Sequence, residues 1–130
     1  MEKQCIAVTG ISEMLAKSKV PLSPAVKAGD FVFVSGMPPI DRTTGEMIEG
    51  DIKAQTRQVL ENVKACLEAA GSSLDKVVKC TVYAANAGYF GAINEIYGEY
   101  FPHDPPARTF AAVGSWPMPF DIEIECIAMA

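Results

Sequence analysis

Residues 105–130 read PPARTFAAVGSWPMPFDIEIECIAMA and contain two apolar runs joined by a proline-rich turn. The first run, Ala107–Val113, is short and continuously apolar apart from its first positions, which predicts a strand. The second run, Asp121–Met129, alternates with a period of two, the pattern of a strand with one buried face. Glu123 and Glu125 fall on the same face of that second strand. Two carboxylates in so apolar a segment are candidates for a site, although a half-exposed antiparallel strand with a wet face shows the same alternation.

Arg108 is the only basic residue of this stretch and stands at the start of the first run. A guanidinium in apolar surroundings needs an acidic partner, because an unpaired buried charge is costly. One reading gives it a permanent ion pair with Glu123 or Glu125. The other gives it the carboxylate of a ligand, for which the planar fork of arginine is well suited.

The composition limits the classes of protein to which the chain can belong. With 130 residues it is long enough for one domain, 1–130, with its own core. Hydrophobic residues make up 49%, a content that favours a homo-oligomer in which subunit contacts bury apolar surface. The formal net charge of −5 argues against binding to nucleic acid, which depends on clustered Lys and Arg.

Neither a membrane span nor a secretion signal is expected. No apolar run reaches the length of a bilayer-spanning helix, and the first residues, MEKQCIAVTG, lack a basic segment followed by an apolar one. We therefore expect a cytoplasmic protein without a membrane partner.

The cysteines and the histidine predict no metal site. Cys5, Cys66, Cys80 and Cys126 are far apart, and the only histidine, His103, lies between prolines in a predicted loop. Metal sites need several ligands at close spacing. We expect Cys66, Cys80 and Cys126 to be buried core residues and His103 to be exposed, and we expect no metal or other cofactor.

The remaining segments predict an α+β fold in which two helices cover one face of a single sheet. The helix at 52–70 has the clearest pattern, with apolar residues three and four positions apart, Asp51 as its N-cap and Gly71 as its stop. The strand that reaches Ser35 and Gly36 stops before two prolines, which leaves backbone N–H and C=O groups unpaired at its end. These groups can bind a ligand, or the segment is an ordinary strand end. In chain order, the expected segments are a strand at Cys5–Val8, an irregular segment at Thr9–Ala28 with at most a short helical turn, a strand at Phe31–Ser35, a hairpin-like polar stretch at Asp41–Asp51, helix Ile52–Ala70, strand Val77–Ala84 and helix Tyr89–Phe101.

Four segments together resemble the RidA family (YjgF/YER057c/UK114). They are GDFVFVSG at 29–36, DIKAQTRQVLENVKACLEAAGSSLDKVVKCTVY at 51–83, PPAR at 105–108 and DIEIECIA at 121–128. The resemblance covers most of the chain and implies a chorismate-mutase-like fold assembled as a homotrimer, with sites in clefts between subunits. It also implies hydrolysis of reactive 2-imino or 2-enamino acids to 2-oxo acids and ammonia.

The resemblance assigns roles to individual residues of this chain. Arg108 matches the family arginine that binds the carboxylate of a small-molecule substrate. Glu123 matches the glutamate that holds or activates the attacking water. Ser35 and Gly36 match the end of a strand that faces the ligand, and Asn94 matches an asparagine at the edge of the site.

Two positions depart from the family pattern. Leu22 stands in LSPA where the family usually has a tyrosine, and Phe110 stands in RTFA where a cysteine is frequent. Both changes imply a more apolar and bulkier pocket, which places the hydrolysis of the smallest imines in doubt. Two alternatives remain: a non-catalytic module that binds a 2-oxo acid or an aromatic acid, and a ribonuclease, which the acidic charge disfavours.

Overall fold

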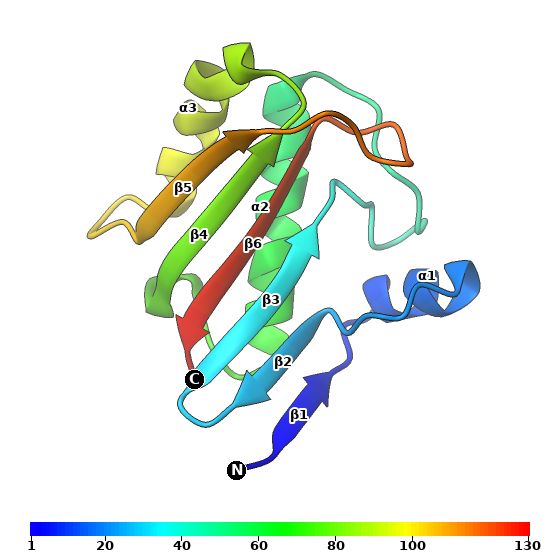
Figure 1. Cartoon of the computed structure of the whole chain (residues 1–130), viewed down its shortest axis with the longest axis vertical. Helices are drawn as coiled ribbons and strands as arrows, with labels where there is room; N and C mark the ends of the chain where they lie inside the picture. Colours follow the sequence, from blue (N-terminus) through cyan, green and yellow to red (C-terminus); the bar gives the residue numbers. More distant parts are fainter.

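The computed structural model describes residues 1–130 and has one six-stranded sheet, in the order β1-β2-β3-β6-β4-β5 (Figure 1). Every neighbouring pair is antiparallel except β4 and β5, so the sheet is mixed. The elements are β1 (Lys3–Ile6), α1 (Ile11–Ser18), β2 (Ala25–Ala28), β3 (Phe31–Met37), α2 (Ile52–Ala69), β4 (Val77–Ala84), α3 (Phe90–Tyr100), β5 (Ala107–Ala112) and β6 (Ile122–Met129), with short 3-10 turns at Leu74–Lys76 and Ala87–Tyr89.

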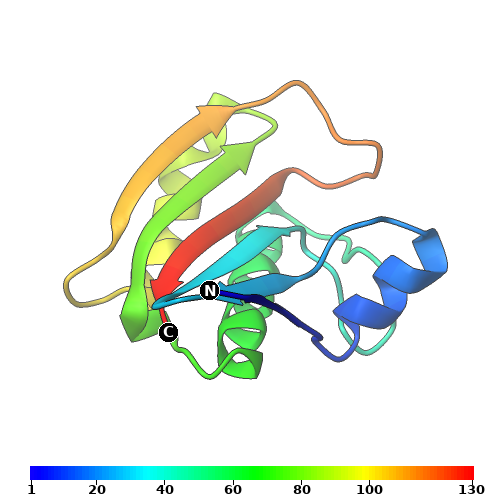
Figure 2. The same cartoon turned by 60° about the horizontal axis from the view of Figure 1, so that its bottom comes forward.

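Helices α2 and α3 cover the same face of the sheet, and α1 lies beyond its β1–β2 end (Figures 1 and 2). The parallel strands β4 and β5 require a crossover connection, which α3 supplies. The α+β prediction of one mixed sheet covered on one face by two helices is confirmed. The C-terminal strand β6 runs through the middle of the sheet, between β3 and β4.

Helix α2 forms the core as its sequence predicts. Its apolar stripe, including Val59, Val63 and Cys66, is fully buried against β6 and β3. The Asp51 side chain caps the helix by accepting a hydrogen bond of 2.9 Å from the backbone N–H of Ala54. Beyond the helix, Gly71 adopts φ 81°, a left-handed conformation that ends helices. The predicted burial of all three core cysteines and the exposure of His103 are also confirmed.

The prediction of an irregular Thr9–Ala28 segment is wrong, because it contains both α1 and β2. Helix α1 has only two turns and buries Ile11 and Leu15, a stripe too short to distinguish from a loop. Strand β2 has four residues and pairs with β3 across the turn at Gly29, so tertiary pairing rather than its own pattern defines it.

The bounds of two strands also differ from the prediction by two residues. Strand β1 spans Lys3–Ile6 instead of Cys5–Val8. Strand β3 continues past Ser35 and Gly36 to Met37, with an irregular register opposite β6 between Val34 and Met37. Such a bulge bends the strand and turns local side chains, and it lies beside the candidate site. None of the helices combines the length and the apolar character required to cross a bilayer.

Candidate functional site

Glu123 lies on the face of the sheet opposite the helices, where it is half-buried. On β6 its neighbours Ile122 and Ile124 are fully buried on the helix side, so the period of two turns Glu123 to the other side. Gly36, in the irregular part of β3, leaves the space that the carboxylate fills. A Cβ atom built at Gly36 would lie 2.1 Å from Glu123 Oε1. The strand-end glycine is therefore required by the position of the glutamate.

The environment of Glu123 makes its carboxylate hold a proton more strongly than usual. Burial raises its pKa, the nearby indole N–H of Trp116 opposes the shift, and the charge of Glu125 adds to the rise. A carboxylate with a raised pKa is a better proton acceptor, which suits a general base. Burial is the larger cause of the shift, and the charge of Glu125 makes a smaller contribution.

Glu125 has a different position from Glu123, although it lies on the same face. It is exposed, and the hydroxyl group of Tyr83 donates a hydrogen bond of 3.1 Å to its Oε1. Tyr83 is the β4 residue that pairs in register with Glu123, so the bond crosses diagonally between the two strands. Glu125 is therefore a solvated carboxylate held beside the site by Tyr83.

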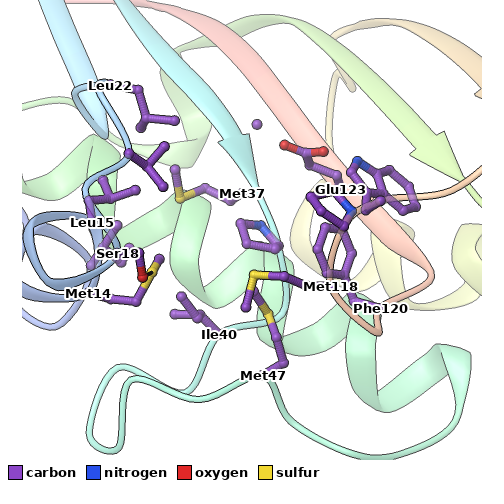
Figure 3. Close-up of a pocket in the computed structure, with 16 residues that line it drawn as sticks. Met14, Leu15, Ser18, Leu22, Met37, Ile40, Met47, Met118, Phe120 and Glu123 are labelled. Carbon is purple, nitrogen blue, oxygen red and sulfur yellow. Dashed lines mark hydrogen bonds between the residues drawn. The ribbon is translucent and has the colours of Figure 1, made fainter.

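An apolar pocket with about 180 Å³ of internal space adjoins Glu123 (Figure 3). We call it the methionine pocket. Its lining comes from α1, the end of β3, the loop after β3 and the loop before β6, and includes Met14, Leu22, Met37, Met47, Trp116, Met118, Phe120 and Glu123. Figure 3 shows the Glu123 carboxylate at one side of this pocket, with Leu22 and Met14 across from it and Met47 at the lower end. The predicted site residue Leu22 thus lies with Glu123.

Buried amides of α2 hold the segments that carry this site. The backbone N–H of Asp121 donates to Gln55 Oε1 at 2.8 Å, and Gln55 Nε2 donates to Asp121 Oδ2 at 3.0 Å. This two-way contact fixes the start of β6, two residues before Glu123. Asn62 Nδ2 donates to the carbonyl oxygens of Pro38 and Ile40, both at 2.9 Å, and so fixes the loop that forms part of the pocket.

Ser35 has a structural contact in the chain. Its hydroxyl group donates a hydrogen bond of 2.6 Å to the carbonyl oxygen of Ser23. This bond ties β3 to the segment that carries Leu22, the neighbour of Ser23. The predicted role of Ser35 at the ligand stays a prediction, and its visible role is to hold one wall of the methionine pocket.

Arg108 lies on the helix side of the sheet and has no acidic partner. Its guanidinium carbon is 4.8 Å from the ring centroid of Tyr97 and 5.5 Å from that of Phe90, both on α3. The two ion pairs of the structure join α2 to α3, Lys53 to Glu95 and Arg57 to Glu99. Arg108 is therefore stabilised by two aromatic faces, a cation–π arrangement that leaves its N–H groups available. The alternative of a permanent ion pair with Glu123 or Glu125 does not hold in this chain.

Asn94 and Phe110 lie on the same side as Arg108. Phe110 packs edge-on against Phe90, with ring centroids 5.0 Å apart. Asn94 is one turn from both Phe90 and Tyr97 on α3, and its buried Oδ1 has no hydrogen-bond partner in the chain. The buried hydroxyl group of Tyr97 also has none. Buried polar atoms are rarely left unpaired, so Asn94 Oδ1 is a candidate to meet a ligand. The hydroxyl group of Tyr97 instead faces the buried thiol of Cys80, and burial together with this thiol raises the pKa of Tyr97.

The structure therefore divides the predicted site residues into two groups. Leu22, Ser35, Gly36 and Glu123 form one group, and Asn94, Arg108 and Phe110 form the other. Arg108 pairs with Cys80, which pairs with Cys126, three residues beyond Glu123. Strand spacings put the Cα atoms of Arg108 and Glu123 roughly 14 Å apart, with side chains on opposite faces. One chain does not bring its arginine and its glutamate to the same ligand.

The sequence prediction missed three aromatic residues of these two groups. Phe90 and Tyr97 lie on α3, where Phe90 is 46% exposed and Tyr97 is buried. Their spacing of four and three residues from Asn94 places all three on one helical face, a signal that was available in the sequence. Trp116 is the only tryptophan of the chain and stands in the proline-rich turn before β6.

Comparison with known proteins identifies the family. Residues 13–130 match the family model described as Endoribonuclease L-PSP. The chain is 55% identical to a RutC family protein of Pyrococcus horikoshii over 83% of this chain and 86% of that protein. It is 42% identical to the chloroplastic Reactive Intermediate Deaminase A of Arabidopsis thaliana over 83% of this chain and 58% of that protein. A crystal structure from Thermotoga maritima superposes with a TM-score of 0.90 at 44% identity, over 100% of this chain and 98% of that one. The chain belongs to the RidA family (YjgF/YER057c/UK114) and has its fold.

Proposed function

We propose that this protein is a 2-iminoacid and enamine deaminase that hydrolyses reactive imino acids to 2-oxo acids and ammonia. The observation that carries the proposal is the unpaired guanidinium of Arg108, held on two aromatic rings with its hydrogen-bond donors free. Such a group suits bidentate binding of a carboxylate. The name of the Arabidopsis relative, Reactive Intermediate Deaminase A, supports the same reaction class.

The chemistry needs little beyond orientation and a base. A protonated imine is electrophilic at the carbon next to the carboxylate, so binding the carboxylate at Arg108 fixes the reacting carbon. Glu123 accepts a proton from water as the oxygen attacks that carbon, which gives a carbinolamine. Return of the proton to nitrogen makes ammonia the leaving group. As the C–N bond breaks, Glu123 takes the hydroxyl proton, and the C=O bond of the 2-oxo acid forms. Burial raises the pKa of Glu123, which favours the first of these transfers, the acceptance of a proton from water.

We further propose that the site forms between subunits of a homotrimer. Arg108 and Glu123 lie on opposite faces of the sheet, so a complete site needs Arg108 from one copy and Glu123 from another. A heterologous contact of this kind closes into a ring, and the family resemblance gives three as the number of subunits. The uncovered sheet face carries Phe31, Phe33 and Met129, each at least 44% exposed, which is consistent with a surface that other copies cover.

Charge distinguishes this proposal from the nuclease reading that the name of the family model suggests. The net charge is −5, and the carboxylates Glu123 and Glu125 share one strand face. A phosphate backbone would be repelled there. Binding of a 2-oxo acid without turnover is the remaining alternative, and the missing tyrosine at Leu22 is the feature that favours it.

The test is ammonia release from imino acids generated in place by an amino-acid oxidase, measured against the spontaneous rate. The wild-type protein should accelerate release. Glu123→Gln should lose the acceleration and keep the binding of 2-oxo acids, since it removes the base and leaves Arg108 in place. Ammonia release at the spontaneous rate, together with tight 2-oxo acid binding, would establish the binding module instead.

A further inference from the structure

The methionine pocket adjoins Glu123 and is larger than attacking water requires. Its rim is formed by exposed residues, among them Leu22 and Met118, and its floor by buried ones, among them Met37 and Ile40. The pocket therefore leads from the surface to the core at the end of β3. A water molecule held by the carboxylate occupies only a small part of this space.

The size of the pocket sets a limit for what it can hold. Its internal space is about 180 Å³. An engineered apolar protein cavity of about 150 Å³ stays dry and binds benzene, a molecule of six heavy atoms. The methionine pocket is thus large enough for an apolar group of about six heavy atoms.

The lining indicates the chemistry of that group. Four of the six methionines of the chain, Met14, Met37, Met47 and Met118, contribute to the lining. Methionine side chains are unbranched and polarizable, and they adapt to ligands of varied shape. Glu123 is the only charged residue of the lining, so the carboxylate end of a ligand is repelled and an apolar end is favoured.

We infer that the methionine pocket receives the substrate side chain, and that the preferred substrate is a 2-imino acid whose aliphatic or thioether side chain has about four to six heavy atoms. This inference rests on the proposed deaminase function. With the carboxylate on Arg108 of one copy and the reacting carbon beside Glu123 of the next, the side chain is the only apolar part of the substrate left to enter the pocket.

The first experiment measures ammonia release from a series of imino acids whose unbranched side chains increase by one carbon at a time. Each methylene that enters the pocket should raise kcat/KM roughly fourfold. The rise should stop at about six heavy atoms, where the pocket is full. In parallel, Trp116 gives a readout that does not need turnover, because it is the only tryptophan and lines the pocket. Its fluorescence should respond to 2-oxo acids of the same series, with Kd decreasing along the series.

Substitutions at Met47 change the space in opposite directions. Met47→Ala should move the optimum to longer side chains, and Met47→Trp should move it to shorter ones. Ile48→Ala is the matched control, since Ile48 is half-buried in the same loop but does not line the pocket, and it should leave the optimum in place. Met14→Ala enlarges the pocket from α1 and serves as a second variant if the loop does not tolerate the change.

The outcomes separate this inference from the function on which it rests. Ammonia release that is equal along the series and unaffected by Met47 substitutions would overturn the inference and leave the deaminase standing. No release from any imino acid, with Trp116 fluorescence still following chain length, would overturn the deaminase and leave an apolar acid-binding pocket. Release with an optimum that moves as the pocket is resized supports both.

Discussion

Replacing Gly36 with alanine tests the geometry of Glu123 without touching its chemistry. The added Cβ atom would lie 2.1 Å from Glu123 Oε1 and 2.7 Å from Cδ. To restore ordinary contact the carboxylate must move by about 1 Å, which a flexible side-chain end can do at small cost. The backbone at Gly36 is not in the left-handed region, so the alanine itself adds no strain there.

We expect Gly36→Ala to fold normally and to lose about 100-fold in kcat, because a displacement of 1 Å at a catalytic group has an effect of that order. Binding of a 2-oxo acid at Arg108 should change much less. Steady-state kinetics, calorimetric titration and a melting curve measure the three quantities. Gly98→Ala is the control: Gly98 is exposed on α3, nothing lies within 4 Å of an added Cβ atom, and helix propensity predicts a gain of about 0.5–1 kcal/mol in stability. Full activity in Gly36→Ala would refute the role of the Glu123 position.

Three further predictions concern the charges and the assembly. Arg108→Lys keeps the charge but loses the planar guanidinium fork, so calorimetry should show 2-oxo acid binding weakened by about 2 kcal/mol. The Tm should be nearly unchanged because no ion pair is broken, and a large fall in Tm with unchanged affinity would contradict this prediction. Glu123→Gln should have a larger free energy of unfolding than the wild type at pH 7, because a carboxyl group with a raised pKa loses its contribution to stability as pH rises through that pKa. Below the ordinary carboxyl pKa of 4.5 the two proteins should be equally stable, and urea unfolding at pH 7 and below pH 4.5 measures both values. Light scattering should give about three times the chain mass of 13.9 kDa, and a monomer would leave the site incomplete.

Local patterns in the sequence were sufficient for the elements that form the core. Helix α2 has a long apolar stripe between Asp51 and Gly71, β6 alternates along its length, and β4 alternates from Cys80 onward, so each segment largely specifies its own structure. At the start of β4 the alternation fails, because an irregular register between Val77 and Lys79 buries Val77 and exposes Val78. Strand β2 and helix α1 were missed because each is short and is stabilised by contacts with distant segments. The fold class was predictable because the missed elements lie at one end of the sheet and not in its core.

The candidate site was predictable as a set of residues but not as an arrangement. Resemblance to the family singled out Arg108 and Glu123, and alternation placed Glu123 opposite the apolar face of its strand. The side to which Arg108 points depends on the register of β5 against β4, a parallel pairing across the α3 crossover. Register between distant strands is set by tertiary packing, so the sequence of β5 alone could not assign it. The contacts of Arg108 with Phe90 and Tyr97 depend on the same register, so they could not be predicted from the sequence either.

Placing the two charges on opposite faces of the sheet has a consequence for binding. Within one chain Arg108 and Glu123 cannot neutralise each other, so the arginine keeps its donors and the glutamate keeps its proton affinity. In the proposed inter-subunit site the two groups would approach from different copies, and a 2-imino acid would fit between them because its carboxylate carbon and its reacting carbon are directly bonded. The ligand carboxylate would then bind Arg108 and keep Glu123 from pairing with it. On this proposal the substrate separates the two protein charges, while the aromatic rings of Phe90 and Tyr97 hold Arg108 in position in the absence of a ligand.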